Sequence, residues 1–117
     1  MTRIAIIGGG PAGYEAALVA AQHGASVTLI DSDGIGGACV LWDCVPSKTF
    51  IASTGVRTDL RRARDLGITL DPNQATVQLS EVNGRVKALA LAQSSDIRSK
   101  LQTVGVTVLA GRAELVG

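Results

Sequence analysis

A short glycine-rich segment near the N-terminus, GGGPAG at 8–13, constrains the fold of this chain more than any other feature. It follows directly on the apolar, β-branched run RIAII at 3–7 and opens the alanine-rich stretch 11–23. Such a run predicts a buried parallel strand covered on both faces, and the stretch after the glycines predicts a helix, with Pro11 suited to its first turn. A second apolar run, ASVTLI at 25–30, completes a strand, a helix and a strand joined by a right-handed crossover.

The three glycines of this G-x-G-x-x-G pattern each serve a different purpose at a dinucleotide site. Gly8 allows a tight turn, Gly10 allows a pyrophosphate to approach the backbone, and Gly13 allows the helix and the strand to pack closely. Pro11 and Ala12 begin the helix, whose free N–H groups and positive dipole end favour phosphate. Because the pattern lies between a predicted strand and a predicted helix, we expect a dinucleotide to bind here.

The acidic residue Asp31 limits which dinucleotide binds. It lies 18 residues after Gly13, at the end of the second predicted strand. A carboxylate at this place accepts hydrogen bonds from ribose hydroxyls and repels a 2′-phosphate. We therefore expect the adenosine half of FAD or NAD, and not of NADP. The simpler interpretation, a glycine-rich turn beside a surface aspartate, explains fewer of these features.

Composition excludes several classes of protein. With 117 residues, the chain has room for one compact domain. Eleven Lys and Arg against ten Asp and Glu give a net charge of +1, and aromatic residues make up 3%, so no surface for nucleic acid is expected. No apolar run approaches the roughly 20 residues that span a bilayer, and the N-terminus lacks the features of a secretory signal. We expect a cytoplasmic protein.

The rest of the chain predicts two long helices and at least one further strand. The helices are expected at about 41–66 and 80–104, a strand at 106–109, and a second candidate strand at 111–116. The alternation of strands and helices predicts an α/β fold with a parallel sheet. An apolar stripe on the second helix consists of Val82, Val86, Leu89, Ile97, Leu101 and Val104.

Two cysteines, Cys39 and Cys44, form the motif C-x4-C, and Lys48 follows one helical turn later. In a cytoplasmic protein such a pair is more often catalytic or metal-binding than a structural disulfide. Metal is a poor candidate, because the distant His23 does not complete a set of four ligands. A five-residue step in a regular helix spans about 7.5 Å, so a disulfide requires Cys39 on the loop side and Cys44 in a distorted first turn. Redox chemistry and two inert thiols both remain open from the spacing.

Four segments, in order along the chain, resemble the flavoprotein pyridine nucleotide-disulfide oxidoreductases. They are GGGPAGYEAA from Gly8, the acid at Asp31, GGACVLWDCVPSKT from Gly36, and GRAELV from Gly111. Within this group, VPSKT and the residues after it are most similar to a lipoamide-dehydrogenase-like branch whose members are called NAD(P)H quinone dehydrogenases. The resemblance implies a Rossmann-like FAD-binding domain, three-layered around a parallel sheet, of which residues 1–117 are the incomplete N-terminal portion.

The resemblance also implies FAD as the cofactor, with NAD(P)H as a co-substrate that binds outside these residues. It implies Cys44 as the thiol beside the flavin, Cys39 as the thiol that meets a disulfide substrate, and Lys48 as a neighbour of the flavin N5. It further implies that Asp31 holds the adenosine ribose and that the backbone of Ala113 touches the adenine end. The residues implied in cofactor binding are Gly8, Gly10, Pro11, Ala12, Gly13, Asp31, Gly36, Gly37, Ala38, Cys39, Lys48 and Ala113; no metal ligand is implied.

Three residues around the cysteine pair depart from the family pattern. Ala38 stands where threonine is usual, which removes a hydroxyl from the flavin site. Asp43 stands where glycine is usual, and its carboxylate disfavours the anionic form of the dithiol. Trp42 replaces a smaller residue beside the disulfide face. These departures favour direct transfer of electrons to a quinone over a relay through Cys39 and Cys44.

The sequence holds no second G-x-G-x-x-G, and its single histidine, His23, ends the first predicted helix. We therefore expect NAD(P)H-binding and dimerisation domains outside this chain. The expected function is the FAD-binding part of an NAD(P)H-dependent oxidoreductase that reduces a quinone or, through the cysteine pair, a disulfide. Dihydrolipoamide dehydrogenase proper and a non-catalytic FAD-binding module are the alternatives. The expected partners are a small-molecule or disulfide electron acceptor and, in the full-length protein, a second copy of the chain.

Overall fold

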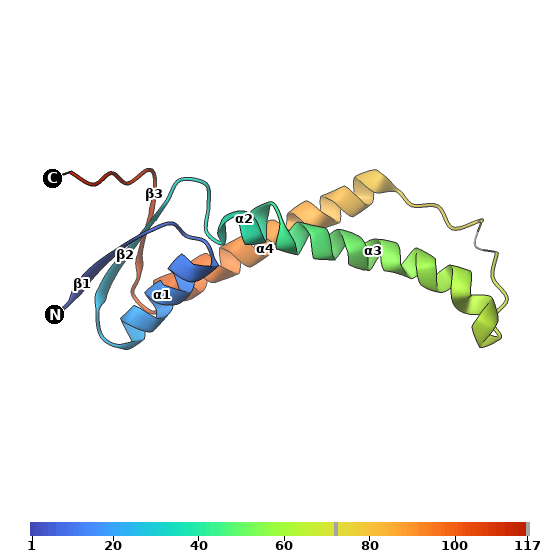
Figure 1. Cartoon of the computed structure of the whole chain (residues 1–117), viewed down its shortest axis with the longest axis horizontal. Coiled ribbons are helices and arrows are strands. Elements are labelled where there is room, and N and C mark those ends of the chain that lie inside the picture. Colours follow the sequence, from blue (N-terminus) through green and yellow to red (C-terminus); the bar gives the residue numbers. More distant parts are fainter. Residues whose placement is uncertain (72, 117) are drawn as a thin grey trace.

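The structure, a computed structural model, describes residues 1–71 and 73–116 and has the predicted α/β architecture (Figure 1). In chain order the elements are β1 (Arg3–Ile7), α1 (Pro11–Gln22), β2 (Ser26–Asp31), α2 (Gly37–Leu41), α3 (Cys44–Arg62), the 3₁₀ helix η1 (Ala63–Leu66), α4 (Leu79–Thr103) and β3 (Thr107–Ala110). In the described part of the chain, no helix combines the length and the apolar character needed to cross a membrane.

The three strands form a parallel sheet in the order β1-β2-β3. Arg3 lies opposite Ser26 and each following residue of β1 pairs in step with β2, while Thr28 of β2 lies opposite Thr107 of β3. The predicted strand-helix-strand unit is therefore confirmed. Its consequence is that the carboxyl ends of all three strands lie at one edge of the sheet, where the glycine loop follows β1 and Asp31 ends β2.

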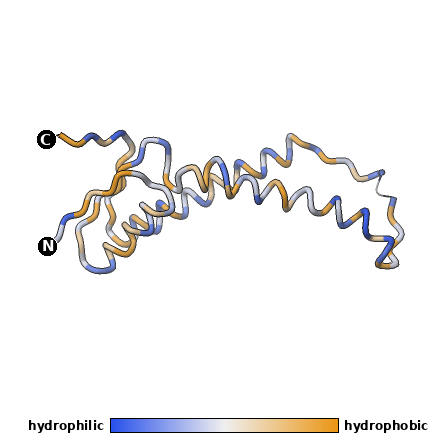
Figure 2. The backbone as a smooth tube through the Cα atoms, in the orientation of Figure 1, coloured by the Kyte–Doolittle hydropathy of each residue, from blue (hydrophilic) through white to orange (hydrophobic). Residues whose placement is uncertain are grey.

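One face of the sheet carries the core. Val27 and Leu29 of β2 are 2% and 0% exposed, and α1 and the C-terminal part of α4 pack against this face. Figure 2 shows the apolar residues gathered over the strands and α1. Two of the three expected layers, the sheet and one helical layer, lie within the described residues. The buried core cluster consists of Ala17, Val27, Leu29, Ile35, Leu101 and Val106.

The opposite face of the sheet is open in the described part of the chain. The residues of β1 alternate between exposed and half-buried, and Ile7 on the open face is 57% exposed. Leu109 of β3 is 49% exposed. The expectation that RIAII is covered on both faces is thus wrong for these residues, because every helix that packs on the sheet does so from one side.

Helices α3 and α4 form a long antiparallel pair that projects from the sheet (Figure 1). The molecule measures 66 × 26 × 20 Å, and its radius of gyration is 20.2 Å, whereas a compact domain of this length has about 13 Å. No residue of α3 is buried, and α4 buries only Val86, Ala90 and Leu101 along its 25 residues. We call this pair, with the connection between its helices, the helical arm; it covers residues 44–103.

Three sequence expectations need correction. The helix expected at 41–66 is interrupted at Trp42 and Asp43, where the backbone leaves helical geometry, and α3 gives way to η1 after Arg62. The segment 111–116 is irregular and forms no strand. In α4, whose bounds match the prediction within one residue, Leu89 of the expected stripe is 42% exposed, and its neighbour Ala90 is buried instead.

Because Leu29 is fully buried at the centre of the core, we expect Leu29→Ala to lower the free energy of unfolding by about 2–5 kcal/mol. The measurement is urea unfolding followed by circular dichroism. Val19 of α1 is 50% exposed, so the control Val19→Ala should change stability by less than about 1 kcal/mol. Equal effects of the two substitutions would contradict this placement of the core.

Candidate functional site

The glycine loop turns the chain sharply from β1 into α1. Gly8 has a φ of 106°, in the left-handed region that glycine adopts without strain. Its N–H donates a hydrogen bond of 2.8 Å to the carbonyl of Ile30, which joins the loop to the end of β2. The carbonyl of Gly10 accepts a bond of 2.9 Å from the N–H of Tyr14, so α1 begins at Pro11, as the sequence predicts.

Gly13 and Gly10 lack side chains for different reasons. A Cβ at Gly13 would lie 1.8 Å from the carbonyl oxygen of Gly8, so close packing of helix and loop requires glycine there. A Cβ at Gly10 would meet no atom within 4 Å, and the backbone of Gly10 is extended, with φ −71°. Neither packing nor backbone strain accounts for Gly10. Room for a group outside the chain does account for it, as the pyrophosphate role predicts.

A second glycine segment, at 36–37, lies directly against the first. The N–H of Gly36 donates a hydrogen bond of 2.7 Å to the carbonyl of Gly9. A Cβ at Gly37 would lie 2.8 Å from the Cα of Gly10, and Gly37 has a φ of 59°. The structure therefore brings together two segments that the sequence places more than 20 residues apart. Ala38 and Cys39 follow in α2, immediately beyond this contact.

Asp31 fastens this arrangement through its carboxylate. Its Oδ2 accepts a hydrogen bond of 2.6 Å from the N–H of Gly9, and its Oδ1 accepts bonds of 2.8 and 2.7 Å from the N–H groups of Asp33 and Gly34. Partial burial acts to raise the pKa of the Asp31 carboxyl, but these three bonds outweigh burial and hold the pKa below its ordinary value. Oδ1 uses both of its lone pairs in these bonds, but Oδ2 keeps one, so a ribose hydroxyl still finds an acceptor here.

Some residues of this region were not found from the sequence. Gly9 leaves no room for a side chain, because a Cβ there would lie 2.9 Å from Cδ1 of Ile35. Ile35 is 1% exposed, and its carbonyl accepts a hydrogen bond of 2.5 Å from the hydroxyl of Ser94 in α4. A lone isoleucine among glycines was the available signal for this anchor.

The predicted site residue Ala113 is half-buried. It lies two residues beyond Gly111, whose N–H donates a hydrogen bond of 2.9 Å to the carbonyl of Asp31.

The cysteine pair lies across the break between α2 and α3. Cys39 is in α2 and Cys44 is the first residue of α3, while the N–H groups of Trp42 and Asp43 both donate to the carbonyl of Ala38, at 2.9 and 2.8 Å. The predicted first-turn position of Cys44 is confirmed. Cys39 lies in a short helix rather than on a loop, and the break between the helices supplies the departure from regular helix that the spacing requires.

The surroundings of Cys39 favour its protonated form. The hydrogen bond with the Cys44 side chain is the largest influence that raises the pKa of the Cys39 thiol; desolvation and the charges of Cys44 and Asp43 act in the same direction. The positive charge of Lys48 opposes them, and the net shift is upward. The predicted unfavourable effect of Asp43 on a thiolate thus falls on Cys39. Both cysteines are free thiols, Cys39 half-buried and Cys44 exposed.

Together, two glycine segments in contact, a helix N-terminus and an aspartate at the end of β2 define a dinucleotide-binding α/β unit with an adjoining thiol pair. The comparison with protein families agrees with this class: residues 2–117 match the family described as pyridine nucleotide-disulphide oxidoreductase. The chain belongs to this family, whose members are FAD-binding flavoproteins and oxidoreductases.

Within this family, the chain is similar to two kinds of dehydrogenase. The chain is 61% identical over 119 aligned positions to an NAD(P)H dehydrogenase (quinone) of Mycobacterium tuberculosis, covering 99% of this chain and 24% of that protein. It is 34% identical to a dihydrolipoyl dehydrogenase of Halobacterium salinarum, with the same coverage. The crystal structure of LpdA from Mycobacterium tuberculosis superposes with a TM-score of 0.91 at 59% identity, covering all of this chain and 25% of LpdA. The chain thus spans about a quarter of the length of these relatives.

The residues present fit FAD. The backbone at Gly10 faces open space and packs against Gly37, so a pyrophosphate has access to main-chain atoms. Pro11 carries no N–H, while the N–H groups of Ala12 and Gly13, in the first turn of α1, have no partner within the helix. These are the donors and the clearance that a phosphate at a helix N-terminus requires.

The two glycines of this loop can be separated experimentally. In the full-length protein we expect Gly10→Ala to leave folding stability within about 0.5 kcal/mol of the wild type, because the new Cβ enters open space. FAD affinity should fall at least about tenfold, since the methyl group occupies the place of a phosphate contact. Gly13→Ala should reduce both stability and FAD affinity, because its Cβ collides with Gly8. FAD titration by fluorescence and thermal unfolding of the apoprotein measure the two effects; a Gly10→Ala variant that binds FAD normally would contradict the assignment.

The lowered pKa of Asp31 predicts how stability changes with pH. A carboxyl whose pKa is lower in the folded than in the unfolded state stabilises the fold above the unfolded pKa, and this contribution disappears as pH falls through the folded pKa. At neutral pH we expect Asp31→Asn to cost about 1 kcal/mol, through weakened bonds to Gly9 and Gly34. This difference should shrink as the pH is lowered below the ordinary value of 3.8. The measurement is the free energy of unfolding of both proteins across that pH range. A difference in this free energy that does not change with pH would argue against an ionised Asp31 that holds the three N–H groups.

Proposed function

We propose that this chain is the FAD-binding, N-terminal part of an NAD(P)H-dependent flavoprotein oxidoreductase that reduces a quinone. The observation that carries the proposal is the meeting of the two glycine segments at Gly10 and Gly37, with Asp31 on one side and the cysteine pair on the other. The 61% identity with an NAD(P)H dehydrogenase (quinone) supports the choice of acceptor.

The residues have the following parts in this proposal. The N–H groups of Ala12 and Gly13 bind the pyrophosphate, and the carboxylate of Asp31 accepts hydrogen bonds from the adenosine ribose. Gly36, Gly37, Ala38 and Cys39 lie along the flavin half, and Ala113 lies toward the adenine. When bound here, FAD supplies a two-electron carrier that can be reduced by a nicotinamide and reoxidised by a quinone. Lys48 places a positive charge near the thiols, where it stabilises negative charge on a thiolate or on the reduced flavin.

The state of Cys39 supports a quinone over a disulfide as electron acceptor. In a disulfide relay, an attacking thiolate forms a mixed disulfide and the second thiol then resolves it, so that two thiols become one disulfide while the substrate disulfide becomes two thiols. Cys39, the thiol expected to attack, has a raised pKa and is therefore less often a thiolate at neutral pH. Trp42, 72% exposed between the two cysteines, offers a flat aromatic face at the same place.

A disulfide reductase is the second candidate. It is supported by both cysteines being free thiols on either side of the break between α2 and α3, and by the 34% identity with a dihydrolipoyl dehydrogenase. In either case NAD(P)H binds elsewhere in the full-length protein, which we propose to be a cytoplasmic homodimer. Residues 1–117 on their own then bind FAD without catalysing turnover.

Removal of both thiols distinguishes the two acceptors. In the full-length, FAD-loaded protein, Cys39→Ser with Cys44→Ser should leave reduction of a soluble benzoquinone by NADH or NADPH within about threefold of the wild type, since the thiols lie outside that path. Lipoamide reduction, if the wild type shows any, should be abolished. Loss of quinone reduction in a variant that still binds FAD would contradict the quinone proposal. Counting thiols anaerobically before and after NAD(P)H gives an independent answer, because two new thiols place the pair on the electron path.

A further inference from the structure

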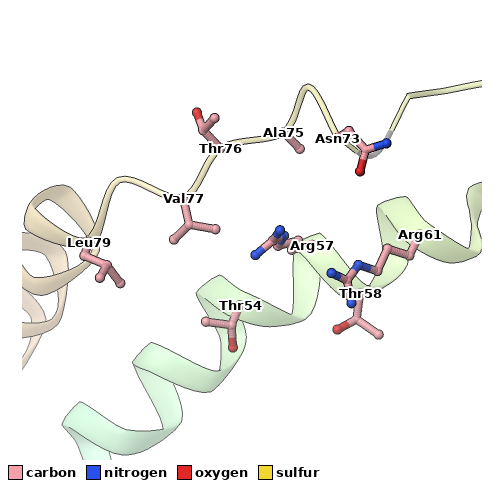
Figure 3. A pocket seen from close by; sticks show the side chains of 9 residues that line it. All are labelled: Thr54, Arg57, Thr58, Arg61, Asn73, Ala75, Thr76, Val77 and Leu79. Atoms are coloured by element: carbon pink, nitrogen blue, oxygen red, sulfur yellow. The ribbon is translucent and has the colours of Figure 1, made fainter.

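A hollow of about 660 Å³ lies in the helical arm, far along the chain from the glycine segments. It is formed between α3 and the segment 73–79 that leads into α4, and Figure 3 shows its side chains. Its volume is within the range typical of sites for small molecules. None of the residues that line it belongs to the proposed FAD site or to the thiol pair, so these sites do not explain why the hollow is there.

The helix presents a polar surface to this hollow. Thr54, Arg57, Thr58 and Arg61 recur three and four residues apart and so lie on one face of α3. In Figure 3 the Arg57 side chain reaches toward the segment 73–79, and the Arg61 side chain runs along α3 toward Thr58. An amphipathic helix normally turns its apolar face toward the rest of the protein, yet here Ile51 is 65% exposed and the two arginines, themselves exposed, line the hollow.

The charges that line the hollow are of one sign. No acidic residue is among the described residues that line it. Among the described residues, one guanidinium donates a hydrogen bond to another side chain: that of Arg85, to the hydroxyl of Ser53 at 3.1 Å. Arg57 and Arg61 make no such bond in this part of the chain. Two arginines four residues apart on a helix repel each other. A bound anion between Arg57 and Arg61 removes that repulsion and uses donors that the arm leaves free.

We propose that this hollow binds a phosphate-bearing organic molecule, with the phosphate held by Arg57 and Arg61. Guanidinium groups match phosphate oxygens through paired hydrogen bonds, and Thr58 adds a hydroxyl on the same face of α3. Val77, on the opposite wall, provides apolar surface for the remainder of the ligand. A bare phosphate would leave this apolar wall without a contact, which points to a phosphate ester, either a soluble metabolite or a phospholipid head group.

The test uses the full-length, FAD-loaded protein, so that the FAD site is filled, with glycerol 3-phosphate as the probe at constant ionic strength. Isothermal titration should show binding that falls at least about tenfold in Arg57→Gln with Arg61→Gln, because two charge-assisted contacts are lost. Arg62→Gln is the control: it removes one positive charge from the same helix, half of what the double variant removes, and Arg62 does not line the hollow. It should bind as the wild type does.

A second arm of the experiment separates the two sources of phosphate. Sedimentation with phosphatidylcholine vesicles, with and without phosphatidic acid, tests the lipid source, and a loss of sedimentation confined to the double variant supports it. Equal affinity of the double variant and Arg62→Gln for both probes would overturn the proposal, as would a wild type that binds neither. Should the double variant fail to fold, Arg61→Lys keeps the charge but loses the paired hydrogen bonds, and it should still weaken binding relative to Arg62→Gln.

Discussion

The carboxylate of Asp31 is the interaction on which the site depends most. Its two oxygens accept hydrogen bonds from Gly9 in the first glycine segment and from Asp33 and Gly34 at the start of the loop that leads to the second. One side chain thus joins the ends of two neighbouring strands to the loop that delivers the cysteine pair. Because these donors are backbone N–H groups, the clamp constrains main-chain position directly. Gly36 reinforces the same junction by donating to the carbonyl of Gly9.

The arrangement of the thiols follows from this junction. With Gly37 packed against Gly10, α2 must begin at the dinucleotide site, and its single five-residue turn brings Cys39 to the break at Trp42 and Asp43. Cys44 then starts α3 near enough to Cys39 to raise the pKa of the Cys39 thiol. The position of the thiols relative to the glycine segments is therefore set by the contact of Gly37 with Gly10 together with the burial of Val40 in α2. Their chemistry is adjusted by nearby charges, with Asp43 and Lys48 acting on Cys39 in opposite directions.

The sequence predicts the local features of this molecule well, because they depend on neighbouring residues. The strand, glycine loop and helix at the N-terminus, the bounds of α4 and the helix-start position of Cys44 follow from spacing and residue type. Features that depend on distant contacts were not predictable. The capture of Gly9 by Asp31, the anchoring of Ile35 by Ser94 and the preference for Ala90 over Leu89 at the inner face of α4 each require the tertiary packing to be known. Similarly, the segment 111–116 has strand-like residues but no partner strand among the described residues beyond β3.

The elongated form of the helical arm has a consequence for hydration. A compact monomer of 12.0 kDa has about 6,000 Å² of accessible surface, whereas this chain exposes 8247 Å². The surplus is comparable to the total area buried in an ordinary protein–protein contact. After folding, these residues therefore leave more surface exposed to water than a compact protein of the same mass does. The hydrophobic contribution of Ile51, Val56 and Leu91 to stability is consequently small in this chain alone, and it becomes appreciable only when further protein surface excludes water from the arm.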